Sequence, residues 1–154
     1  MDSIDIDKKL REWQLELPVA SSPGGAYTSV NIRGKVAYIA IQFPIINGEL
    51  GYTGRFGENL TTKDGYKAMQ QAALNVLSQI HDKIGLDKIE GLNHMDAYYQ
   101  SGENWNEAPQ IVDGASELFL HVLGIKGTHS RAIFGVHKLY GNLSVGITCH
   151  LTLK

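Results

Sequence analysis

The sequence predicts an α+β fold in which two helices cover one face of a mixed β-sheet. The chain has 154 residues, which suits a single domain spanning 1–154 with a substantial core. Two long stretches carry apolar residues at helical spacing, and the last stretch alternates apolar and polar residues as a half-buried strand does. After a short N-terminal helix, the predicted order is strand, strand, helix, strand, helix, strand, strand.

The segment 1–18 is predicted to be a short helical arm that docks on the domain. Its apolar residues recur at near-helical spacing: Ile6, Leu10, Trp13 and Leu17. Pro18 cannot continue a helix and is expected to end it. The run Ser-Ser-Pro-Gly-Gly at 21–25 is typical of a loop and leads into the first strand.

Two strands and a long loop are predicted next. Extended segments near 27–32 and 35–43 are joined by a turn at Arg33-Gly34. Glycines at 48, 51, 54 and 57 then favour a loop over 44–60. No lysine followed by Ser or Thr closes this loop, and its spacing is not the dinucleotide fingerprint, so we expect no phosphate-binding loop.

The clearest helix signal covers 62–84. Thr61 and Asp64 can form a capping box at its start, and Gly85 suits its end. Its apolar side chains share one face, which indicates packing on the core. These residues are Tyr66, Met69, Ala73, Val76, Leu77, Ile80 and Ile84.

A strand near 89–99 and a second helix near 107–123 follow. Asn106 is the expected cap of that helix, Pro109 is tolerated in its first turn and Gly124 lies at its exit.

Two strands close the chain, and the last, over 143–153, is the easiest to predict. Its odd positions from Val145 to Leu153 are apolar, whereas Gly146, Thr148, His150 and Thr152 alternate with them. The preceding strand begins at Arg131. One sheet face is left uncovered by this arrangement, and association into a small ring would cover it and create clefts between subunits.

Arg131 suggests a binding site for a small carboxylate. A guanidinium held at the start of a strand can bind a carboxylate through two parallel hydrogen bonds. An ordinary surface salt bridge explains the same residue, and this segment alone favours that simpler explanation. The choice between a binding site and a salt bridge depends on the rest of the chain.

Composition and motifs exclude several other classes of function. The formal net charge of −2 gives no general reason to expect nucleic-acid binding. The sequence has neither an apolar run long enough to span a membrane nor a signal segment, so we expect a cytoplasmic protein. Six histidines lack zinc-ligand spacing, no serine elbow is present, and the single cysteine, Cys149, is expected to be a packed thiol.

Several short motifs, in order and spacing, resemble the YjgF/RidA family, also described as endoribonuclease L-PSP, over nearly the whole chain. The similarity is greatest to its longer branch, which has an N-terminal helix. The matching pieces are Leu17-Pro18, Tyr27, Gln42-Phe43-Pro44, Tyr52-Thr53-Gly54 with Gly57, Ala72-Ala73-Leu74-Asn75, Asp113-Gly114-Ala115-Ser116-Glu117-Leu118, and Gly127-x-His129-x-Arg131 before Gly135-Val136.

The resemblance implies a chorismate-mutase-like fold, a homotrimer and ligand sites between subunits. It also implies hydrolysis of reactive enamines and imines to 2-keto acids and ammonia, with no cofactor and no metal. By analogy, Arg131 would hold the substrate carboxylate, Tyr27 and Asp113 would line the cleft, and backbone groups near Ile41 and Ile133 would contact the imine nitrogen and water. An iminium is already electrophilic, so the protein need only orient it and deliver water.

The sequence departs from the family pattern at positions that matter for catalysis. The glutamate that active members carry on the last strand aligns with Gly146, the Ser-Gly-Gln run reads Ala40-Ile41-Gln42, and Leu-Pro reads Leu139-Tyr140. His137 and Asp113 are weak candidates to deliver water instead. A non-catalytic trimer that binds small carboxylates or keto acids is therefore the alternative, and a ribonuclease is disfavoured because no basic surface or His/Lys constellation is evident.

Overall fold

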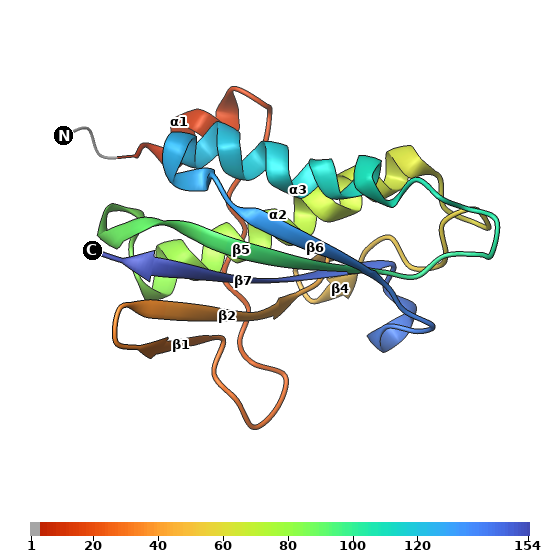
Figure 1. Ribbon diagram of the computed structural model, residues 1–154, viewed down its shortest axis with the longest axis horizontal. Coiled ribbons are helices and arrows are strands. Elements are labelled where there is room, and N and C mark those ends of the chain that lie inside the picture. Colours follow the sequence, from red (N-terminus) through yellow and green to blue (C-terminus); the bar gives the residue numbers. More distant parts are fainter. Residues whose placement is uncertain (1–3) are drawn as a thin grey trace.

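The helices and strands of the chain follow the predicted order (Figure 1). The structure is a computed structural model that describes residues 4–154. Its helices are α1 (Ile6–Arg11), α2 (Thr62–Lys83) and α3 (Ala108–Leu123). Its strands are β1 (Val30–Arg33), β2 (Val36–Gln42), β3 (Ile45–Ile46), β4 (Glu49–Leu50), β5 (Ile89–Tyr99), β6 (Ser130–Gly135) and β7 (Val145–Leu153). Short 3₁₀ turns lie at Leu86–Lys88, Gly124–Gly127 and Tyr140–Asn142.

Five strands form one mixed sheet in the order β1-β2-β7-β5-β6. Only the β5–β6 pair is parallel among these neighbours, and the others are antiparallel. The strand β7 lies at the centre, where it pairs with β2 on one side and β5 on the other. The strands β1 and β6 therefore form the two edges, and this separation decides where the site residues lie.

The helices α2 and α3 pack side by side on one face of this sheet, as predicted (Figure 1). The core lies between them and the buried side of the strands, where Ile147 and Leu151 of β7 are fully buried. A third helix, α1, packs on α3 rather than on the sheet. None of the helices described within 4–154 has the length and apolar character that crossing a membrane requires.

The start of α2 has the predicted capping box. The N–H of Asp64 donates to the Thr61 hydroxyl at 3.1 Å, and the Thr61 N–H donates to the Asp64 carboxylate at 2.8 Å. The bond from the Thr61 backbone lowers the pKa of Asp64 below its ordinary value. Two N–H groups that a helix start leaves without partners are thus satisfied.

Two predictions for the N-terminal part were wrong in their extent. The first helix ends at Arg11 and does not reach Pro18, because Gln14 adopts a left-handed backbone (φ 58°) that breaks it. The first strand begins at Val30 rather than at 27, because the Tyr27 hydroxyl folds back to accept the Gly24 N–H. The segment between the N-terminal helix and β1 contains a strap, defined here as residues 18–29.

Two further details differ from the prediction. The expected loop over 44–60 contains a small hairpin of β3 and β4. The cap of α3 is Glu107 rather than Asn106, and its side chain makes no capping bond. The Glu107 carboxylate instead accepts a hydrogen bond from the Thr62 hydroxyl at 2.8 Å, which links the starts of α2 and α3.

The sheet face opposite α2 and α3, called here the open face, carries a row of polar and aromatic side chains. Tyr38, His150, His94 and Ser130 are cross-strand neighbours on β2, β7, β5 and β6. The rings of Tyr38 and His150 stack with centroids 5.5 Å apart. Within residues 4–154 no helix covers this row (Figure 1). The open face thus presents both hydrogen-bonding groups and ring surfaces to a neighbour.

The close approach of α2 and α3 depends on Gly114. A Cβ atom built on Gly114 would lie 2.1 Å from the carbonyl oxygen of Tyr66, far inside van der Waals contact. A Gly to Ala change inside a helix ordinarily stabilises the fold by about 0.5–1 kcal/mol. We expect Gly114→Ala to do the opposite and to lower the free energy of unfolding by about 1–3 kcal/mol, because the helices must separate.

Urea denaturation followed by circular dichroism measures this effect. Gln110→Ala, at an exposed position of the same helix, is the matched control and should change stability by less than about 0.5 kcal/mol. A Gly114→Ala protein as stable as the unmodified chain would show that helix contact does not require the glycine.

Candidate functional site

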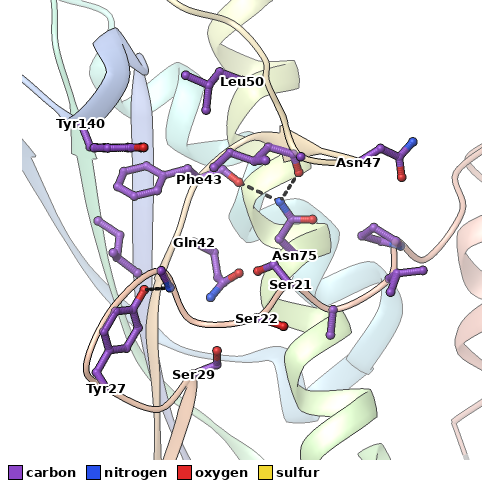
Figure 2. A pocket seen from close by; sticks show the side chains of 17 residues that line it. Ser21, Ser22, Tyr27, Ser29, Gln42, Phe43, Asn47, Leu50, Asn75 and Tyr140 are labelled. Atoms are coloured by element: carbon purple, nitrogen blue, oxygen red, sulfur yellow. Dashed lines mark hydrogen bonds between the residues drawn. The ribbon is translucent and has the colours of Figure 1, made fainter.

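A cavity of about 740 Å³ opens beside the end of β2 (Figure 2). Its walls come from the strap, the end of β2, the β3–β4 hairpin, α2 and the turn at Tyr140–Asn142. The lining residues include Val19, Tyr27, Ile41, Phe43, Leu50 and Tyr140. Ligand sites usually occupy roughly 300–1,000 Å³, so this cavity has the size of a small-molecule site.

Amide and hydroxyl side chains of α2 hold the cavity walls in place. The Asn75 amide nitrogen donates to the carbonyl oxygens of Phe43 (2.7 Å) and Ile45 (3.0 Å), as Figure 2 shows. One helical turn further on, Ser78 donates to the Pro18 carbonyl at 2.6 Å and Gln79 donates to the Ser21 carbonyl at 3.0 Å. Each bond satisfies a backbone group outside regular structure, so α2 anchors both the strap and the chain after β2.

Tyr27 and Ile41, two of the predicted site residues, line this cavity. The Tyr27 hydroxyl oxygen accepts the Gly24 N–H at 3.0 Å, which leaves its own proton available to a ligand. Ile41 lies at a β-bulge, because the register against β7 shifts between Ile39 and Gln42. Bulges commonly redirect groups next to binding sites.

The described lining of the cavity contains no Asp, Glu, His, Lys or Arg. A carboxylate inside such a cavity would lack a cationic partner from this chain. The cavity therefore offers shape and a hydroxyl donor, but no charge.

Gly146, which the sequence resemblance aligns with a family glutamate, is packed behind this wall. Gly146 is buried, and a Cβ atom there would lie 2.9 Å from both the Ile41 Cδ1 and the Phe43 Cε1 atoms. These apolar side chains occupy the space that a larger residue would need. Ile41 and Phe43 thus form an apolar wall against this position.

Arg131 lies on β6, where the sequence predicted it, and faces α3. Its Nη1 donates to the Asp113 carboxylate at 2.8 Å and to the Ser116 hydroxyl at 3.1 Å. Both contacts use Nη1, and within residues 4–154 the Nε and Nη2 groups have no hydrogen-bond partner. The guanidinium is thus oriented and keeps the edge that can hold a carboxylate in two parallel bonds.

A chain of hydrogen bonds behind Arg131 explains the Gly-x-His-x-Arg motif. The His129 Nδ1 lies 2.6 Å from the Gly127 carbonyl oxygen, and its Nε2 lies 3.0 Å from the Ser116 hydroxyl. Because a carbonyl can only accept, Nδ1 carries the proton and Nε2 accepts from Ser116. The Ser116 oxygen is then directed at Arg131. Sequence reasoning had not identified Ser116 or His129 as positioning residues.

The predicted site residues do not meet within one chain. Tyr27 and Ile41 lie near the β1–β2 edge, whereas Arg131, Asp113 and Ile133 lie on or near β6 at the other edge. Ile133 pairs with Ala97 and packs against the core beside Arg131. The two groups are separated by the width of the sheet.

His137, a candidate to deliver water, takes no part in this arrangement. The strand β6 ends at Gly135, and His137 is exposed in the following loop, where its carbonyl accepts a hydrogen bond from Arg55. The neighbouring side chains of Ser130 and His129 point to opposite faces of the sheet, because Ser130 contacts His94 whereas His129 contacts Ser116.

The structure also forms a serine–histidine–aspartate row that the sequence did not suggest. The His94 Nδ1 lies 2.6 Å from the Ser130 hydroxyl and its Nε2 lies 2.8 Å from the Asp96 carboxylate. These residues lie on the open face, outside the cavity, and we assign them to linking β5 with β6. Within 4–154, His, Cys, Asp and Glu side chains form no group of three or more that could hold a metal ion.

The comparisons with known proteins place the chain among relatives of one family. A family model described as "YjgF/chorismate mutase-like, putative endoribonuclease" matches residues 7–147. Protein TCP17 of Trypanosoma cruzi is 31% identical over 138 residues, which cover 87% of this chain and 85% of TCP17.

Two crystal structures share the fold closely. A "putative endoribonuclease" from Shewanella oneidensis MR-1 is 30% identical with a TM-score of 0.92, and the match covers 96% of this chain and 99% of that one. Protein Atu1372 of Agrobacterium tumefaciens, described as having unknown function, is 30% identical with a TM-score of 0.90, over 97% and 92% of the two chains.

Cys149 should be unreactive in the folded protein. It is only 3% exposed, and burial, with a smaller contribution from the Asp96 charge, raises the pKa of its thiol to about 12. Almost no thiolate exists at pH 8, and the thiolate is the reactive form. With Ellman's reagent at pH 8 we expect no native labelling within an hour and one thiol per chain after unfolding in guanidinium. Rapid native labelling would mean that the strand opens.

Proposed function

Because the chain belongs to the YjgF/chorismate mutase-like family, we propose that it hydrolyses reactive 2-imino and enamino acids in clefts between the subunits of a homotrimer. The products would be 2-keto acids and ammonia. Membership of this family supports a small-molecule-binding or deaminase-like role. We extend that role to this reaction because the site is divided between two sheet edges. We propose the cytoplasm as the place of the reaction.

The divided site is the observation that carries the proposal. The cavity has a hydroxyl donor and no charge, and an oriented arginine with two unused donor groups lies at the opposite edge. A second copy that places its β6 edge beside the cavity of the first would complete the site. The open face, where Tyr38 is 49% and Phe134 is 45% exposed, is the surface that such copies would share.

In the assembled cleft each residue would have a distinct task. Arg131 would hold the substrate carboxylate in two charge-assisted hydrogen bonds, with Asp113 and Ser116 keeping it in place. The Tyr27 hydroxyl would donate to the oxygen that forms when water adds to the iminium carbon. Loss of ammonia from that adduct restores a carbonyl and gives the keto acid. The protein contributes orientation and electrostatic stabilisation, and no cofactor enters the scheme.

A trimer that binds keto acids without turnover is the second candidate. It is favoured by the apolar wall of Ile41 and Phe43 in front of Gly146, which leaves no carboxylate to activate water. Introducing Gly146→Glu alone would force these side chains aside, so a test of the missing carboxylate requires Ile41→Ala in the same protein. Ribonuclease activity has less support, because the described cavity lining contains no basic residue.

Removing the arginine should abolish catalysis while leaving the fold intact. Two charge-assisted hydrogen bonds contribute roughly 1.5–3 kcal/mol each, so Arg131→Ala should lower kcat/KM by about 100-fold or more. Imines are generated in situ by an amino-acid oxidase, and their loss is followed by semicarbazide trapping. Arg11→Ala, which removes a surface arginine of α1, is the matched control and should retain full activity. Unchanged rates in Arg131→Ala would overturn the proposal.

Mixed assemblies test whether the site is shared between subunits. Tyr27→Ala and Arg131→Ala chains are each expected to be inactive alone. When the two are refolded together in equal amounts, each cleft takes its Tyr27 and its Arg131 from different chains, so about one quarter of the clefts should be intact. Activity should return to about that fraction of the unmodified protein. No recovery in mixtures shown by mass to contain both chains would place the whole site in one chain.

A further inference from the structure

We propose that the cavity selects acids with a large, uncharged side chain of aromatic size, and that Phe43 and Tyr140 form the wall against which this side chain packs. The inference rests on the proposed function for the position of the carboxylate and the reacting carbon. It concerns the part of the same site that would hold the substrate's side chain. Its substrates would be the 2-imino counterparts of amino acids such as phenylalanine and leucine, and the corresponding 2-keto acids would be its products and ligands.

The size of the cavity supports a large substrate. Its volume of about 740 Å³ lies in the upper part of the range of roughly 300–1,000 Å³ typical of sites for drug-sized ligands. An imine derived from alanine or serine has only a handful of non-hydrogen atoms and would leave most of this space to water. The cavity extends from Tyr27 past Phe43 to Leu50 of the β3–β4 hairpin (Figure 2).

Apolar side chains face this space beside the Ser, Asn and Gln groups of the lining. Side chains from four separate segments line it: Val19 and Ala20 of the strap, Ile41 and Phe43 of β2 and its end, Ile45 and Leu50 of the hairpin, and Tyr140. Several of them are exposed in the single chain, with Val19 at 91% and Leu50 at 43%. A ligand that covers them would gain from removing apolar surface from water.

Two amide nitrogens in the lining are already engaged within the chain. The Asn75 nitrogen donates to the two backbone carbonyls of Phe43 and Ile45, and the Gln42 nitrogen donates to the Ala40 carbonyl at 3.0 Å. A ligand that needed these two nitrogens as donors would have to displace these bonds, whereas an apolar side chain leaves them intact.

Tyr140 stands at a fixed place on the cavity wall. Its ring centroid lies 6.3 Å from that of Phe43, and the pair presents two ring surfaces. Its turn is braced from beneath by the buried Gln100, whose side chain accepts the Leu139 N–H at 2.8 Å and donates to the Asn142 side chain at 2.8 Å. The residue Tyr140 is 71% exposed, although the backbone of its turn is held. A fixed and exposed ring at a cavity mouth is suited to contact a ligand.

The neutral lining predicts exclusion of charged side chains. The described cavity residues contain no acid or base that could pair with a second carboxylate or an ammonium group. Burial of a charge without a partner is strongly unfavourable. The 2-imino acids derived from glutamate or lysine should therefore be poor substrates, and 2-ketoglutarate a poor ligand.

The test measures hydrolysis and binding separately on the full-length protein. Imines are generated in situ from phenylalanine, leucine, 2-aminobutyrate and glutamate by amino-acid oxidases, and kcat/KM is determined for each. Binding of phenylpyruvate, 2-ketobutyrate and 2-ketoglutarate is measured by calorimetry. We expect the phenylalanine-derived imine to exceed the 2-aminobutyrate-derived one by about 10-fold or more, a typical discrimination by an apolar pocket.

Three variants test whether Tyr140 is responsible for the preference for aromatic over small imines. Tyr140→Ala should reduce the preference for the aromatic over the small imine, measured as the ratio of kcat/KM values, and weaken phenylpyruvate binding by about 10-fold. Tyr140→Phe keeps the ring and should keep the preference. Ile125→Ala, which truncates a residue that is 90% exposed in the 3₁₀ turn after α3 and does not line the cavity, is the control and should behave like the unmodified protein.

The outcomes separate this inference from the proposed function. Hydrolysis of small imines with no gain for aromatic ones, and no tighter binding of phenylpyruvate than of 2-ketobutyrate, would overturn the inference and leave the proposed function standing. Tight, Tyr140-dependent binding of phenylpyruvate without hydrolysis would uphold the inference and overturn the proposed reaction. Absence of both binding and hydrolysis would overturn both.

Discussion

The close packing of α2 and α3 on one face of the sheet is the constraint on which the rest of the structure depends. It needs a residue without a side chain at Gly114, where the backbone of α2 comes too near for a Cβ atom. Because both helices use the same face, the other face is left open, while the strand order makes β1 and β6 the edges of the sheet. The division of the site between those edges follows from the strand order together with this arrangement of layers.

Each half of the candidate site is held by side chains that bind backbone or other side chains before any ligand arrives. Asn75 fixes the chain after β2 through two carbonyls, and Gln79 fixes the strap. At the other edge His129 orients Ser116, which together with Asp113 orients Arg131. Such preorganisation lowers the entropy lost on binding. The two halves therefore gain affinity from rigid parts rather than from loops that must close.

Gly146 shows how one position can shape the cavity wall. Because this residue has no side chain, Ile41 and Phe43 can approach the strand, and both residues form part of the cavity wall. A larger side chain at 146 would have to displace them. The apolar character of this part of the wall thus depends on glycine at this position.

The order of the main elements, the capping box of α2 and the alternation in β7 could be read from the sequence, because they depend on neighbours a few residues apart. The motif spacing also identified the family and placed Arg131 at the head of a strand. Other features depended on contacts between distant segments. The strap that forms a cavity wall, the turn that presents Tyr140, the His129–Ser116–Arg131 chain and the separation of Arg131 from Tyr27 arise from sheet order and helix packing. Local spacing carries no information about them, because residues far apart in sequence meet only when the chain has folded.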